Sequence, residues 1–319
     1  LLTQPWAAAV DPVGVSAALA SAVCLGAYIL LTQRVGDEVT GITGLAVSMP
    51  VAGLVVTMVA GPSVIGHLTP HLLLAGLGTA WLARCLGISR AGAFLSGLVF
   101  ALGGFNIAHT SHVSILSVTA WLPWLLVMVH RSVLATDLRD RLCYAVGLGM
   151  VVALQFLAGH GQMSLLVLLP ALFWAAGLII HARGRQGTAR KLILPGLCVL
   201  VGTALAFPQL LATLELADLS QRAGGLESSF FTSYSFHPLL TATFLSPFVR
   251  GAPDPEGSVE LMAYLGILPL ALAWIAVRHG HARERWFCLG LAAVGLVLAV
   301  GRWNPLYAYL QRIPVLNLF

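Results

Sequence analysis

Long, uninterrupted apolar stretches recur along almost the whole of this sequence. Most are roughly 17–24 residues long, enough for an α-helix to cross a hydrocarbon core of about 30 Å. Lipid cannot hydrogen-bond to the backbone, so a spanning segment must be a helix or part of a closed barrel. The stretches are continuously apolar rather than alternating, which favours helices. The sequence therefore predicts an all-α, polytopic transmembrane bundle of about ten spans, at residues 13–32, 42–60, 70–84, 91–108, 113–130, 142–158, 163–181, 191–214, 261–277 and 286–301.

The composition agrees with this fold and excludes most soluble classes. Hydrophobic residues make up 58% of the 319 residues, charged residues only 9%, and mean hydropathy is +0.90. A soluble domain of this size could not bury so much apolar surface. The net charge of +5 lies in short loops beside the spans, so no nucleic-acid partner is expected. The five cysteines are scattered singly without a C-x-x-C pair, so neither a metal site nor a cofactor is predicted.

The lysines and arginines fall mainly in alternate loops. Thirteen of the seventeen follow odd-numbered spans, and the other four are Arg222, Arg250, Arg302 and Arg312. Basic residues are enriched in loops that stay in the cytoplasm, so the odd-numbered loops are expected there. Both chain ends and the long loop 215–260 are then expected to be extracytoplasmic. The basic residues of the odd-numbered loops are Arg34, Arg84, Arg90, Arg131, Arg139, Arg141, Arg183, Arg185, Arg190, Lys191, Arg278, Arg283 and Arg285.

Six ordered segments in the larger part of the chain carry a family resemblance. They are the block at 81–126 that contains GGFNIAHTSH, LQFLAGHGQMSL at 154–165, PQLLATLELADLSQRAGG at 208–225, SYSFHPLLTATFLSPF at 233–248, YLGILPLALA at 264–273 and GRWNPLYAYLQRIPVLNLF at 301–319. They make residues 79–319 similar to the YfhO-like family of bacterial membrane proteins, which have a GT-C type glycosyltransferase architecture. The resemblance implies a multi-pass protein of the bacterial cytoplasmic (plasma) membrane. Its implied activity is transfer of a sugar from a polyprenyl-phosphate donor to an extracytoplasmic cell-envelope acceptor.

Residues 1–78 resemble a different family. The run DPVGVSAALASAVCLGAYILLTQRVGDEV, which starts at residue 11, is similar to part of an EamA drug/metabolite transporter of the threonine/homoserine-exporter branch. This part holds two to three of the expected spans, and the two resemblances meet near residues 76–80. A GT-C enzyme carries a catalytic Asp or Glu in its first outer loop, and residues 79–319 lack that loop. The larger domain is therefore expected to be truncated at both ends, and inactive if the missing loop is essential.

The polar residues at the outer ends of spans four to eight, with the long loop, form the candidate site. In a GT-C type transfer, a carboxylate would deprotonate the acceptor hydroxyl and a cation would pair with the donor phosphate. Glu215, Asp218 and His160 are the candidate catalytic residues. His109 and His112 are three apart, but no third ligand accompanies them, so a metal pair is not favoured. The candidate substrate-binding residues are Arg222, Gln162, Gln209, Asn106, His109, His112, Glu227 and His237.

Other interpretations of the same residues remain open. Glu215 and Arg222 can also be read as solvated charges at a helix end and in a loop, and the histidines as ordinary interfacial residues. For the whole chain, the alternatives to a transferase are an EamA-type small-metabolite exporter fragment and a non-functional hybrid of the two families. The expected partners are the lipid bilayer and a lipid-linked sugar, and the sequence predicts no particular protein partner.

Overall fold

A computed structural model of the chain describes residues 70–181, 189–219, 232–246, 261, 263–279, 282–305 and 307–310. By its internal contacts the chain divides into two units, residues 1–69 and residues 70–319. The expected spans 13–32 and 42–60 and most of the transporter-like part lie outside the described residues, as do Arg222, Glu227 and most of the loop 215–260. The described helices belong to the second unit.

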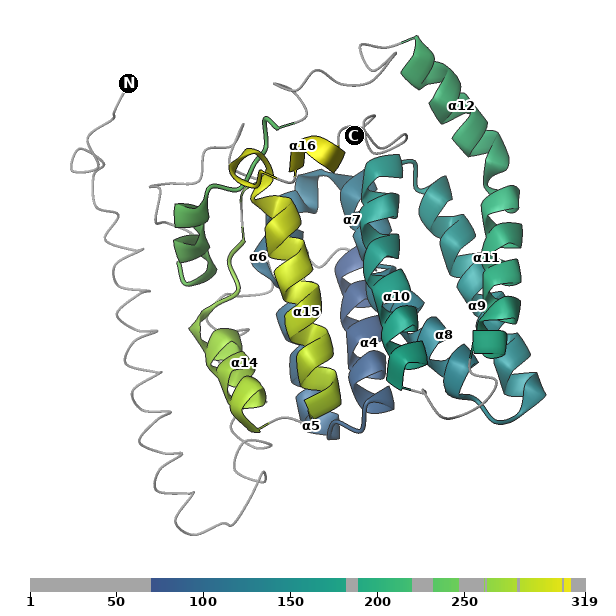
Figure 1. The fold of residues 1–319 in the computed structure, drawn as a ribbon, viewed down its shortest axis with the longest axis horizontal. Coiled ribbons are helices and arrows are strands. Elements are labelled where there is room, and N and C mark those ends of the chain that lie inside the picture. The colour runs from purple at the N-terminus through teal and green to yellow at the C-terminus, as the bar shows by residue number, and fades with distance from the viewer. Residues whose placement is uncertain are drawn as a thin grey trace, which may run out of the picture. The chain divides into compact units, whose positions relative to one another are not determined.

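The described part of this unit is all-helical, without a β-strand (Figure 1). Short 3-10 turns η1 (His109–Ser111), η2 (Ala189–Leu192), η3 (Pro238–Phe244) and η5 (Gly301–Trp303) lie between or beside the helices. The α-helices are α4 (Pro70–Cys85), α5 (Arg90–Ala101), α6 (Gly104–Ala108), α7 (Val113–Thr119), α8 (Leu122–Leu134), α9 (Leu138–Leu157), α10 (Gly161–His181), α11 (Ile193–Leu205), α12 (Phe207–Asp218), α14 (Ile267–His279), α15 (Ala282–Ala299) and α16 (Tyr307–Leu310).

Four helical segments in the described part are long and apolar enough to cross a membrane. They correspond to the predicted spans 91–108, 113–130, 142–158 and 163–181. A fifth crossing is made if α11 and α12 count as one bent span. The described part is therefore compatible with an integral membrane protein. The four segments are Arg90–Ser111, Val113–Leu134, Leu138–Leu157 and Gly161–Ile180.

Two of the other predicted spans, 191–214 and 261–277, differ from the expectation, whereas α4 and α15 are helices close to the predicted spans 70–84 and 286–301. The segment 191–214 is bent by 60° between α11 and α12. Pro208 follows this break and has no N–H for the preceding turn, which explains why α11 does not continue. The helix expected at 261–277 begins only at Ile267, after Gly266 with a φ of +92°. Because α4 and α14 are also short, the described part does not reach the expected number of crossings.

The core of the bundle lies where α8, α9 and α10 meet. Its fully or almost fully buried side chains include Leu125, Val133, Val152 and Trp174. The α9–α11 contact is closer still, because Gly202 faces the backbone of Gly149, and Gly149 faces the backbone of Cys198. In lipid, where hydrophobic association is absent, small residues at such contacts let helices approach and gain van der Waals packing.

Helix α4 packs on α8 on both sides of the boundary expected between residues 78 and 79. The indole Nε1 of Trp124 donates to the carbonyl of Leu74 at 2.9 Å, before the boundary. A Cβ at Gly78 would lie only 2.6 Å from Cδ1 of the same indole. After the boundary, the Trp81 ring lies 5.4 Å from the Trp124 ring, edge-on. The structural division thus falls before α4, at residue 70, and the whole helix belongs to the larger unit.

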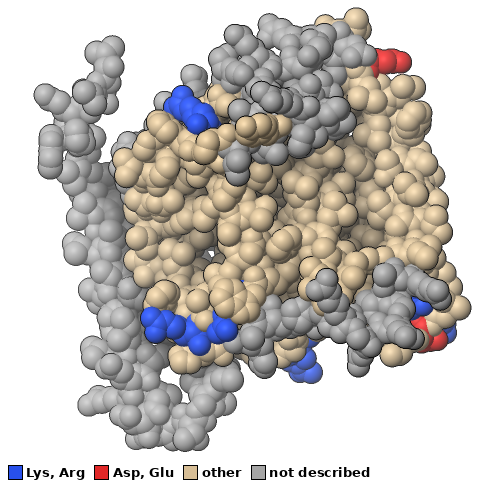
Figure 2. All heavy atoms as spheres, in the orientation of Figure 1, with Lys and Arg blue, Asp and Glu red and all other residues tan. Residues whose placement is uncertain are grey.

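The two ends of the bundle differ in charge. The helices alternate in direction, so the turns after α4, α8, α10 and α14 lie at one end, which we call the basic end (Figure 1). Figure 2 shows most of the visible Lys and Arg side chains along this edge. The opposite end, which we call the polar end, carries Arg302 as its described exception. The basic residues of the basic end whose side chains are described are Arg84, Arg90, Arg131, Arg139, Arg141, Lys191, Arg278 and Arg285.

Candidate functional site

The turn between α6 and α7 holds three of the predicted site residues at the polar end. Asn106 is buried, and its Nδ2 donates to the carbonyl of Phe100 at 2.6 Å. His109 is fully buried, and its Nδ1 lies 2.8 Å from the carbonyl of Phe105. A carbonyl only accepts, so Nδ1 carries the hydrogen and the ring orientation is fixed. His112 is exposed, and its ring lies 5.6 Å from that of His109. The two histidines that the sequence analysis grouped thus lie side by side, but only His112 faces the surface.

His160 and Gln162 lie in the turn between α9 and α10, also at the polar end. Gly159 makes this turn with a φ of +82°, a conformation that favours glycine. The Nδ1 of His160 accepts from the amide of Met163 at 3.3 Å, so this side chain caps the start of α10. Gln162 is half-buried on the first turn of the helix. The Nδ1 of the predicted catalytic histidine, His160, is therefore engaged in capping this helix.

His237 lies in a segment, residues 232–246, that folds against the end of α15. The amide of Phe236 donates to the carbonyl of Ala299 at 2.8 Å, and the amide of Arg302 donates to Ser235 Oγ at 2.8 Å. The ring of His237 lies 4.7 Å from that of Trp303, edge-on. These contacts hold the half-buried His237 at the polar end. Four residues after Trp303, burial raises the pKa of the Tyr307 phenol above its ordinary value.

Residues 263–266 connect this segment to α6. The amides of Leu265 and Gly266 both donate to the carbonyl of Phe244 at 3.1 Å. The amide of Gly104 donates to the carbonyl of Tyr264 at 2.9 Å. The His237 segment and the His109 turn, which are more than 120 residues apart in the sequence, are thus parts of one hydrogen-bonded polar end.

The predicted carboxylates are not assembled with these histidines in the described part of the chain. Gln209 and Glu215 are exposed on α12, which stands apart from α6 and α7 (Figure 1). Asp218 is the last residue of α12, and its side chain lies outside the described residues. Among the described side chains, no group of three or more His, Cys, Asp or Glu could hold a metal ion.

Two further features, one polar and one mainly apolar, have no counterpart among the residues predicted from the sequence. The first is Gln155, which is fully buried in α9 and donates from Nε2 to the carbonyl of Ser164 at 3.0 Å. No described group donates to its Oε1, and such a buried acceptor costs about 1–3 kcal/mol. The sequence signal for this feature is a glutamine inside an apolar span, because a polar side chain in the membrane costs free energy and is typically kept for a function.

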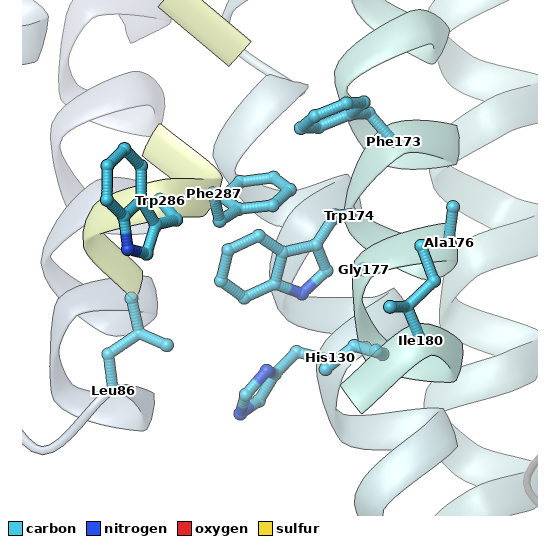
Figure 3. Close-up of a pocket in the computed structure, with 10 residues that line it drawn as sticks. Leu86, His130, Phe173, Trp174, Ala176, Gly177, Ile180, Trp286 and Phe287 are labelled. Atoms are coloured by element: carbon cyan, nitrogen blue, oxygen red, sulfur yellow. The ribbon is translucent and has the colours of Figure 1, made fainter. Parts of the chain in front are cut away.

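The second feature is a pocket of about 210 Å³ at the basic end, away from the predicted site (Figure 3). Its lining is almost entirely apolar and aromatic, with one histidine. No sequence spacing could reveal it, because the lining comes from the α4–α5 turn, α8, α10 and α15. The lining residues are Leu86, His130, Phe173, Trp174, Ala176, Gly177, Leu178, Ile180, Trp286 and Phe287.

Comparison with known proteins adds no relative. No family model, curated protein or solved structure matches this chain. The fold and the geometry of its two ends are therefore the basis for any functional conclusion, together with the sequence resemblances stated above.

Proposed function

We propose that this chain is a membrane-embedded relative of the GT-C glycosyltransferases, which binds a polyprenyl-phosphate sugar and transfers it to an extracytoplasmic cell-envelope acceptor. One observation carries the proposal. Three of the segments that resemble the YfhO-like family, at 103–112, 158–165 and 233–246, contribute to the polar end of the bundle. That end is opposite the basic one, and the enrichment of basic residues in cytoplasmic loops supports a position outside the cytoplasm.

The reaction itself is a displacement at the anomeric carbon of the donor sugar. The acceptor hydroxyl forms a new C–O bond, while the bond from the anomeric carbon to the phosphate oxygen breaks. Polyprenyl phosphate leaves with the electron pair, and the hydroxyl proton passes to a general base. Glu215 and Asp218, at the outer end of α12, are the proposed candidates for this base, and the exposed His112 is a proposed contact for the substrate. Arg222 remains the proposed partner of the phosphate.

Donor consumption in proteoliposomes tests this function without knowledge of the acceptor. The full chain, incubated with a polyprenyl-phosphate hexose and bacterial cell-wall extract, is expected to release polyprenyl phosphate, which chromatography measures. Loss of a general base typically lowers a rate by about 10²–10⁴-fold. Glu215→Gln is expected to show a loss of this order if Glu215 is the base. Asp140→Asn, an exposed carboxylate at the basic end, is the matched control and should stay active.

The outcomes separate the two parts of the proposal. Full activity in Glu215→Gln would remove Glu215 from the site and move the role to Asp218, which Asp218→Asn then tests. No release by the unaltered chain, over that of empty liposomes, would overturn the transferase proposal. The exporter alternative rests on residues 1–78, of which the structure describes 70–78, and these pack as part of the larger unit.

A further inference from the structure

The aromatic pocket at the basic end is open toward the surface that would face lipid. Figure 3 shows Trp286 and Phe287 of α15 opposite Phe173 and Trp174 of α10, with His130 below them. The ring of Phe287 meets that of Trp174 edge-on at 4.3 Å, which closes the inner wall. At the mouth, Ile180 is 58% exposed and Trp286 is 66% exposed. A half-open apolar pocket on a lipid-facing surface is accessible to acyl chains, because none of the described residues forms a polar barrier between it and the bilayer.

A positive charge lies at the mouth of this pocket. The guanidinium of Arg285 stacks over the ring of Trp286, 5.4 Å from its centroid, and its Nη1 donates to the carbonyl of Val277 at 3.1 Å. These contacts hold the charge at the pocket edge, and Arg285 makes no ion pair with any described side chain. Tryptophan and arginine together are typical of the headgroup level of a membrane, where arginines attract anionic lipids.

Trp174 supplies a polar group inside the pocket. Only 7% of the surface of Trp174 is exposed, yet its indole N–H has no hydrogen-bond partner among the described residues. The ring lies in the lining between Phe287 and His130, 5.7 Å from the histidine ring (Figure 3). A buried donor without a partner costs free energy, which an acceptor on a bound molecule would offset. The carbonyl of a fatty-acyl ester is such an acceptor on an otherwise apolar chain.

We infer that this pocket binds one acyl chain of an anionic glycerophospholipid from the surrounding bilayer. The chain lies among Phe173, Trp174 and Phe287, an ester carbonyl accepts from the Trp174 indole, and the phosphate lies beside Arg285. The site is separate from the proposed transfer site, which is at the opposite end of the bundle, and it does not depend on transfer activity.

Native mass spectrometry of the purified full chain in detergent tests this binding directly. Titration with phosphatidylglycerol is expected to give retained lipid at about fivefold lower concentration than phosphatidylcholine, the factor for one basic residue near an anionic lipid. Arg285→Gln should abolish this preference. Ala176→Phe, which places a ring at an exposed position of the lining, should weaken retention of both lipids.

Arg302→Gln is the matched control, because Arg302 also stacks on a tryptophan, Trp303, at 5.1 Å but at the polar end. It should retain phosphatidylglycerol as the unaltered chain does. Equal retention of the two lipids by the unaltered chain, or an equal loss in Arg285→Gln and Arg302→Gln, would overturn the inference. A second measurement needs no variant. Phosphatidylglycerol that is brominated on its acyl chain should quench the tryptophan fluorescence of the unaltered chain more than brominated phosphatidylcholine does. Equal quenching by the two lipids would count against the site.

Discussion

Gly202→Leu is expected to destabilise the bundle strongly. A Cβ at residue 202 would lie against the backbone carbonyl of Gly149, 2.8 Å from its carbon and 3.0 Å from its Cα. Backbone cannot rotate away as a side chain can, so α9 and α11 would have to separate. Overpacking in a close contact typically costs about 1–3 kcal/mol, and here several contacts of one helix pair are lost together. Thermal unfolding in detergent, followed by size-exclusion chromatography, should show a lower midpoint and less monodisperse protein.

Gly196→Leu is the control for this prediction. Gly196 lies on the same helix, but no atom lies within 4 Å of the position that its Cβ would take. The same substitution there should leave the unfolding midpoint close to that of the unaltered chain. An equal loss in both variants would mean that α11 tolerates no leucine at all, and an unchanged Gly202→Leu would show that the close α9–α11 contact does not exist.

Gly104→Val is expected to detach the polar end without unfolding the core. A Cβ at this position would lie 2.6 Å from the carbonyl oxygen of Tyr264 and 2.7 Å from its Cβ. The hydrogen bond between the Gly104 amide and that carbonyl would be lost, and residues 263–266 would no longer be held on α6. The segment 232–246, which is bonded to residues 263–266 through Phe244, would then lose its hydrogen-bonded link to α6.

Hydrogen–deuterium exchange measures this local effect. Amides in 232–246 and 263–266 should exchange at least about tenfold faster in Gly104→Val, which corresponds to about 1.4 kcal/mol of local stability. Amides of α8, α9 and α10 should be unchanged. Gly295→Val is the matched control, since nothing lies within 4 Å of the Cβ position at Gly295. Uniformly faster exchange across the bundle would contradict a local role for Gly104.

The sequence predicted the parts of the fold that depend on length and apolarity. The four segments that qualify as spans lie where continuous apolar runs predicted them, because a run of this length has no stable alternative in lipid. It did not predict that 191–214 bends or that the helix after Gly266 begins late. The bend lies beside Pro208, and the late helix start lies beside Gly266. The effect of a single Pro or Gly depends on where the neighbouring elements lie, which the sequence does not show.

The candidate site was predictable only in part, for a related reason. Spacing placed His109 and His112 in one turn, but it could not show that one is fully buried and the other exposed. The buried His109 ring packs against that of Phe105, with the ring centroids 4.2 Å apart. The contact of His237 with Trp303 and the pocket around Trp174 are each formed by elements far apart in sequence, so no local pattern contains them. The predicted roles of Arg222 and Glu227 stay predictions, since both lie outside the described residues.

Sidedness of the two bundle ends is the most direct test of the membrane fold and of the proposed site. A chain with Cys24, Cys85, Cys143, Cys198 and Cys288 replaced by alanine would carry one new cysteine at a time, at the exposed Ser111 of the polar end or the exposed Thr136 of the basic end. In spheroplasts, a membrane-impermeant maleimide should label Ser111→Cys at once and Thr136→Cys only after the membrane is opened. Labelling of both positions from the same side would contradict a membrane-spanning bundle with an extracytoplasmic polar end.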